Sequence, residues 1–130
     1  MSRKKMTEQE IQMRKTRILM IMSGHVGQGK RIGMGELYER VFEETYDHRI
    51  NDTRRLRKLI TELRRDGVAI CSVASKNGGG YWLASAGSEL EIYCKNLRTR
   101  AIKILGMESK IRKITMSEMM GQMALELKKS

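Results

Sequence analysis

One segment in the middle of the chain constrains the fold more than any other. Between residues 52 and 66, apolar residues recur at i, i+3, i+4 and i+7, on one stripe of an α-helix: Leu56, Leu59, Ile60 and Leu63. The other positions are largely cationic: Arg54, Arg55, Arg57, Lys58, Arg64 and Arg65. Asn51 or Asp52 can cap the start of this helix, and Gly67 supplies a left-handed stop. We expect this helix to bury its apolar face in a core and to expose its charged face on the opposite side.

Two short β-prone runs follow this helix. Residues 68–73 read VAICSV and residues 81–83 read YWL, and β-branched and aromatic residues favour strands. The intervening ASKNGGG contains Asn-Gly, a strong hairpin signal. Because side chains alternate along a strand, we expect one of Tyr81 and Trp82 to face the core and the other to face solvent or a ligand.

Two more helices are predicted nearer the N-terminus. Thr7 and Glu10 form a capping box before an apolar pattern that ends at Ser23-Gly24. A second helix is expected from Met34 to about residue 44. The glycine-rich stretch HVGQGKRIG between them is predicted to be a flexible loop, and residues 45–50 a turn.

The expected order is helix, helix, helix, strand, glycine-rich turn, strand. With LRKLITELRRDGVAICS followed by GGGYWLA, residues 32–84 resemble the N-terminal DNA-binding domain of biotin-repressor-type proteins and the small winged helix-turn-helix proteins of phages. The segments that carry the resemblance are RIGMGELYERVF, INDTRRLRKLITELRRDG and VAICSVASKNGGGYWLA. It implies a recognition helix at 52–66 in the major groove and a wing at 68–84 on the backbone or minor groove. The turn at 45–50 is longer than in the simplest helix-turn-helix, and no enzymatic domain follows the wing.

Charge points to the same partner. The formal net charge of +11 on 130 residues attracts polyanions, and arginine can bridge O6 and N7 of guanine. The candidate DNA-binding residues are Thr53, Arg54, Arg57, Lys58, Thr61 and Arg65 on the helix, Lys76 and Asn77 on the wing, and Lys30 and Arg31 in the loop. The alternatives are a solvated cationic face and a mobile hairpin tip.

A heptad pattern occupies the C-terminal part of the chain. Apolar residues repeat every seven positions at Leu90, Leu97, Ile104 and Ile111, with Tyr93, Arg100, Met107 and Ile114 three residues after each. The candidate oligomerisation residues are Leu90, Tyr93, Leu97, Ile104, Met107 and Ile111. They predict a homodimer, or alternatively a helix that folds back over its own winged domain. A short amphipathic helix rich in methionine follows and offers a surface for a protein partner: Met116, Met119, Met120, Met123 and Leu127.

Several other functions are not expected. GHVGQGKR has the glycine and lysine spacing of a phosphate-binding loop, but Arg31 stands where a magnesium-binding hydroxyl is needed. His25 and His48 have no metal-ligand spacing, and Cys71 has no catalytic partner, so no metal, cofactor or enzyme activity is predicted. No apolar run is long enough for a membrane span, and no secretory signal is evident, which suggests a bacterial cytoplasmic location, including that of a phage-infected host.

The sequence therefore predicts a mainly α fold with a small β-hairpin wing (α+β). Residues 1–84 would form a winged helix-turn-helix domain, followed by a helical extension at 86–130 with a long and a short helix. The expected function is sequence-specific binding of double-stranded DNA by a non-enzymatic, phage- or prophage-type transcriptional regulator. The alternatives are a protein-interaction adaptor and a phage replication or packaging factor.

Overall fold

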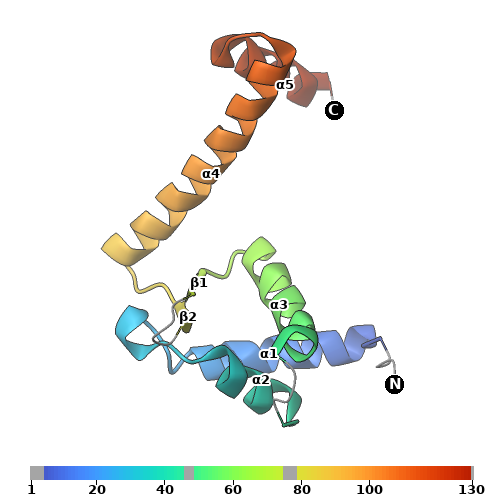
Figure 1. Cartoon of the computed structure of the whole chain (residues 1–130), viewed down its shortest axis with the longest axis vertical. Helices are drawn as coiled ribbons and strands as arrows, with labels where there is room; N and C mark the ends of the chain where they lie inside the picture. The colour runs from blue at the N-terminus through green and yellow to red at the C-terminus, as the bar shows by residue number, and fades with distance from the viewer. Residues whose placement is uncertain (1–4, 46–48, 75–78, 130) are drawn as a thin grey trace. The chain divides into compact units, whose positions relative to one another are not determined.

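The chain is mainly helical with one small hairpin (Figure 1). The computed structural model describes residues 5–45, 49–74 and 79–129. Its elements are α1 (Glu8–Met22), the 3₁₀ turn η1 (Gln28–Lys30), α2 (Met34–Phe42), α3 (Arg49–Arg65), β1 (Ile70–Val73), β2 (Gly80–Leu83), α4 (Ser88–Arg112) and α5 (Met116–Lys129). The predicted class, mainly α with a small β-hairpin, is confirmed. The chain divides into two compact units: the first unit, Met1–Leu90, and the second unit, Glu91–Ser130.

The helix ends follow local signals in the sequence. The Thr7 hydroxyl accepts a hydrogen bond from the Glu10 backbone N–H at 3.2 Å and so caps α1 as predicted. Gly67, with φ 100°, ends α3 in the left-handed conformation. The start of α3 differs from the prediction, because the helix begins at Arg49 and not after a cap at Asn51 or Asp52. No proline or glycine lies between residues 45 and 52 to prevent this earlier start.

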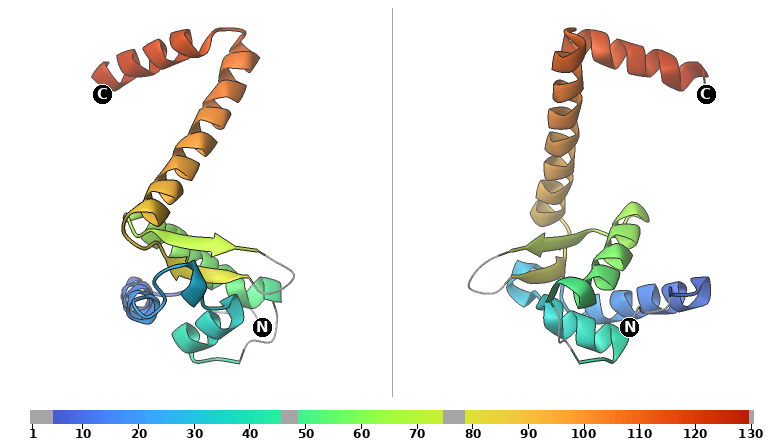
Figure 2. Two further views of the ribbon diagram at one scale, coloured as in Figure 1. Left: turned by 90° about the vertical axis from the view of Figure 1, so that its left-hand side faces the viewer. Right: turned by 45° about the vertical axis from the view of Figure 1, so that its right-hand side comes forward.

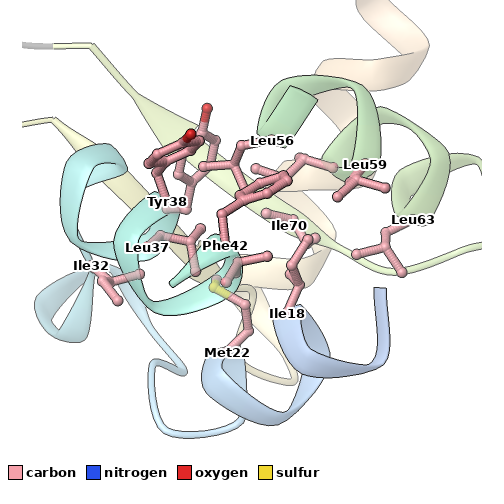
Figure 3. Close-up of a cluster of buried hydrophobic side chains, with 13 residues drawn as sticks. Ile18, Met22, Ile32, Leu37, Tyr38, Phe42, Leu56, Leu59, Leu63 and Ile70 are labelled. Carbon is pink, nitrogen blue, oxygen red and sulfur yellow. The ribbon is translucent and has the colours of Figure 1, made fainter. Parts of the chain in front are cut away.

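A single core holds the first unit together (Figure 3). Helices α1, α2 and α3 contact one another pairwise. The predicted stripe on α3 is confirmed, since its four apolar residues are between 0 and 2 % exposed. The other buried contributors are Ile18 and Met22 of α1, Leu37, Tyr38, Val41 and Phe42 of α2, Ile32, Ile70 and Tyr81.

The glycine-rich stretch between α1 and α2 is not the free loop that was predicted. The Leu83 backbone bonds to both His25 and Gly27, at 2.9 and 2.8 Å. Ile32 and Tyr81 exchange two backbone hydrogen bonds, at 2.9 and 2.8 Å. These contacts satisfy the edge of β2 that does not pair with β1. Gly80 permits the close approach, because a Cβ there would lie 2.5 Å from the Ile32 carbonyl oxygen.

Tyr81 and Trp82, on the two faces of the hairpin, are both buried, which corrects a second prediction. β1 and β2 pair antiparallel (Figure 2), and Cys71 lies opposite Trp82 in the register. Tyr81 and Trp82 are 6 and 7 % exposed, so neither is left for solvent or a ligand. Tyr81 belongs to the core. The indole N–H of Trp82 donates to Glu89 Oε1 at 2.8 Å, so the first turn of α4 covers the second face.

The second unit contains α5 and all of α4 beyond its first three residues. α4 is continuous over 25 residues, including Gly106. It stops at Lys113, which has a left-handed φ of 59°. The Thr115 hydroxyl then accepts from the Glu118 backbone N–H at 3.1 Å and caps α5. Among the described residues, no helix combines the length and apolar character that a membrane span requires.

Candidate nucleic-acid interface

The face of α3 opposite the core carries half of the ten predicted DNA-binding residues. They are Arg54, Arg57, Lys58, Thr61 and Arg65, and all five are exposed. Each residue of a helix advances by about 100°, so these positions cover an arc of roughly 100°. The apolar stripe of α3 covers a similar arc on the opposite side. We call these five residues the basic stripe.

Two neighbouring arginines have structural roles instead. Arg55 donates to the Tyr38 hydroxyl and to Glu44 Oε2, each at 3.2 Å, and its guanidinium lies 4.4 Å from the Phe42 ring centroid. Arg64 donates through Nε to the Ile70 carbonyl at 2.8 Å and through Nη2 to the Ser72 hydroxyl at 3.2 Å. Arg55 therefore ties α3 to the end of α2, and Arg64 ties it to β1. The cationic face is narrower than the sequence suggested.

Thr53 is not part of the interface. Its side chain was predicted to bond a phosphate, but the residue is 2 % exposed. Position 53 lies three residues before Leu56 and seven before Ile60, so the helix turns it toward the core.

The loop candidates lie beside β2. Lys30 and Arg31 are exposed at the end of η1, in a segment held to β2 at both ends. The His25 Nδ1–H donates to the Lys30 carbonyl at 2.7 Å, which braces this segment internally. The wing candidates Lys76 and Asn77 lie outside the described residues.

Acidic residues near the basic stripe are few. Within α3 the sequence has only two acidic residues, Asp52 and Glu62, and Glu62 lies on the flank of the stripe. Asp66, just after the helix, pairs with Lys15 of α1 at 2.8 Å. This hydrogen bond raises the pKa of Lys15 above its ordinary value. In the described part of the chain, Arg54, Lys58 and Arg65 make no hydrogen bond or ion pair.

The oligomerisation candidates form a second uncovered surface, on α4. Leu90, Leu97, Met107, Ile104 and Ile111 range from 40 to 79 % exposed, and Tyr93 is half-buried. The methionine stripe of α5 is only partly open, because Met119 is 2 % exposed while Met120 is 58 % exposed.

Sequence reasoning missed a groove beside α1. A cavity of about 740 Å³ is lined by Met13, Thr16, Arg17, Met20, Ile21 and Arg40. The signal was present, since four of these residues recur at i, i+3, i+4 and i+7 along α1 on a face distinct from its core residues. Arg17 is already engaged there, by the Val41 carbonyl at 3.1 Å and by Glu43 at 3.3 Å.

The described residues hold no cluster of side chains suited to a metal ion. Cys71 is buried, and burial raises the pKa of its thiol, which disfavours the nucleophilic thiolate. The geometry therefore leaves the basic stripe as the principal candidate surface. No protein-family model, curated protein or solved structure matches the chain.

Proposed function

We propose that this chain binds duplex DNA in the manner of a winged helix-turn-helix protein, with the basic stripe of α3 in the major groove. The observation that carries the proposal is the opposition of two stripes on one helix. One stripe is anchored at 0 to 2 % exposure in the core, and the other presents four cations outward. A helix of this kind fits the major groove, where arginine can read guanine and threonine or lysine can contact phosphates.

Repulsion within the basic stripe supports a polyanionic partner. Arg54 lies three and four residues from Arg57 and Lys58, and like charges at these spacings destabilise a helix. Other cations of the first unit are neutralised locally, as Lys15 is by Asp66 and Arg55 by Glu44. Phosphates would relieve this repulsion between like charges.

The hairpin and the loop beside it supply a second set of contacts in this proposal. Lys30 and Arg31 are exposed next to β2, and Arg64 fixes β1 to the same helix that carries the stripe. These hydrogen bonds join α3 to the hairpin, so both elements could contact one duplex. The biological role we propose is a phage- or prophage-type transcriptional regulator acting in a bacterial cytoplasm.

The test compares two variants of equal charge. One replaces Arg54, Lys58 and Arg65 by alanine, and the other replaces the exposed Lys95, Lys128 and Lys129 of α4 and α5. Each lowers the formal net charge of +11 by three. Affinity for a short duplex of random sequence is measured by fluorescence anisotropy over a range of salt concentrations.

We expect the stripe variant to lose about 0.9 of the log–log salt slope for each phosphate contact removed, up to about 2.7 for three. The control should keep most of the wild-type slope. Equal losses in the two variants would show that net charge alone attracts DNA, and a wild-type protein without salt-dependent binding would overturn the proposal. That last result would favour a protein-interaction adaptor, with the exposed part of α5 as its docking surface. Selection of bound duplexes from a random pool then measures sequence specificity.

A further inference from the structure

The long helix α4 presents an apolar surface that nothing in the described chain covers. Its first heptad series, Leu90, Leu97, Ile104 and Ile111, is 40, 45, 62 and 79 % exposed. We call Tyr93, Arg100, Met107 and Ile114, which follow three residues after each member of the first series, the companion series. Its Met107 is 60 % exposed. Isolated exposed leucines are ordinary, but a stripe that keeps a seven-residue period from Leu90 to Ile111 matches the seam of a paired helix.

We infer that α4 pairs with α4 of a second copy, and that the two helices run antiparallel. The occupant of the apolar stripe is thus an identical helix in the opposite direction. Two features of the helix, its central arginine and the charges at its ends, select this direction over the parallel one.

The central arginine argues against a parallel pair. Arg100 occupies the companion series between Tyr93 and Met107, at the middle of Ser88–Arg112. In a parallel pair in register, each companion residue meets its own copy, so two guanidiniums would face each other inside the seam. In an antiparallel pair, companion residues meet the first series, which is leucine and isoleucine throughout. Arg100 can then lay its stem on apolar side chains and extend its charge to water.

The ends of α4 carry opposite charges. Glu89 and Glu91 lie in its first turn, and Lys110 and Arg112 in its last turn. Glu89 is bonded to Trp82 and Arg112 to Glu108, which leaves Glu91 and Lys110 for an intermolecular contact. An antiparallel pair brings Glu91 of each copy toward Lys110 of the other. It also opposes the two helix dipoles, whereas a parallel pair sets like charges and like dipole ends side by side.

The direction of pairing determines how two copies would be spaced on DNA. This step rests on the proposed function. In the antiparallel pair the first units are attached at opposite ends. With Arg100 of each copy set against Leu97 of the other, the two copies of Ser88 lie about 32 Å apart along the pair. This is close to the separation of half-sites one DNA turn apart. A two-fold pair would then favour an inverted repeat.

The pairing direction can be measured on the whole protein without DNA. Ile92, Thr99 and Gly106 share one heptad position on the outer side of α4, and a side chain added at Gly106 meets nothing within 4 Å. Each is replaced singly by cysteine in a Cys94→Ser background, with Cys71 left in place because it is buried. The three proteins are spin-labelled, and distances between copies are measured by pulsed electron paramagnetic resonance.

A parallel pair predicts three equal, short distances, because all three positions are equivalent around the helix. The antiparallel pair with Arg100 against Leu97 predicts axial offsets of about 20, 2 and 23 Å at Ile92, Thr99 and Gly106. Unequal distances with the shortest near Thr99 would support the inference. Equal distances would overturn the direction, and no dipolar coupling at high protein concentration would overturn pairing altogether. None of these outcomes bears on whether α3 binds DNA, so the two proposals fail separately.

Discussion

Two adjacent arginines of α3 should behave in opposite ways when each is replaced by alanine. Arg64 donates to the Ile70 carbonyl at 2.8 Å and to the Ser72 hydroxyl at 3.2 Å. Arg65 is exposed on the basic stripe, and within the described chain it has no partner. Both changes remove one positive charge and one similar side chain from consecutive positions. Each variant is therefore the other's control.

The expected loss for Arg64→Ala follows from its two hydrogen bonds. Ile70 is 0 % exposed in the folded chain, and Arg64→Ala removes the charged donor from which its carbonyl accepts a hydrogen bond. A hydrogen bond to a charged group contributes about 1.5–3 kcal/mol, and the exposed Ser72 hydroxyl adds little. We expect the free energy of unfolding to fall by about 2 kcal/mol. For a unit of this size, the midpoint of thermal unfolding should drop by roughly 8–16 °C.

Thermal unfolding followed by circular dichroism, with DNA affinity measured below the transition, separates the two variants. Arg65→Ala should melt within about 3 °C of wild type and bind duplex DNA more weakly. Arg64→Ala should melt much lower while its folded fraction retains most of the salt slope. If Arg64→Ala melted like wild type, or if Arg65→Ala were the less stable of the two, the division between structural and DNA-facing arginines would be wrong.

Two further predictions concern α4 and the hairpin. The double change Leu97→Glu, Ile104→Glu should convert a dimer into a monomer, because each copy would bury two charges in the seam. The control, Ile92→Glu, Ile102→Glu, changes two similarly exposed residues outside the stripe and should remain dimeric. Size-exclusion chromatography with light scattering measures both outcomes. Burial raises the pKa of Tyr81 above its ordinary value, with nearby arginine charges opposing the rise, so the folded chain keeps this phenol protonated at a pH where the unfolded chain ionises. The contribution of Tyr81 to the free energy of unfolding should therefore be fully present below about pH 10 and be lost as the pH rises above that value. Tyr81→Phe should reduce this loss of stability, as measured by urea unfolding at alkaline pH. An unchanged pH dependence in the variant would contradict this origin.

The parts of the fold that sequence predicted are those governed by local periodicity. The apolar stripe of α3, the Thr7 cap of α1 and the stop at Gly67 each depend on residues within one or two turns. The same periodicity also distinguishes the two structural arginines from the basic stripe. Arg55 and Arg64 lie about 100° from Arg54 and Arg65 in the helical projection, at the borders of the core arc, where a long side chain reaches a neighbouring element.

The parts that sequence did not predict depend on what lies against a face. Four glycines between α1 and α2 suggested a flexible loop, but Ile32 pairs with Tyr81, almost fifty positions later. Alternation correctly put Tyr81 and Trp82 on opposite sides of the hairpin. It gave no information about Glu89, whose helix covers the second side. The periodicity of the sequence thus identifies which residues share a face. It does not identify the other element of the chain that packs against that face.

The energetics of α3 explain why a stripe of like charges can persist in a small protein. The close pairs Arg54–Arg57 and Arg54–Lys58 each cost about 0.2–0.5 kcal/mol, or less than about 1 kcal/mol together. Burying the four apolar residues on the opposite side stabilises the helix by roughly 6–12 kcal/mol before the cost in conformational entropy. The repulsion is therefore small against the anchoring of the same helix. When a polyanion binds the stripe, attraction to the phosphates outweighs this repulsion. The charge pattern that slightly weakens the free protein therefore strengthens the proposed complex.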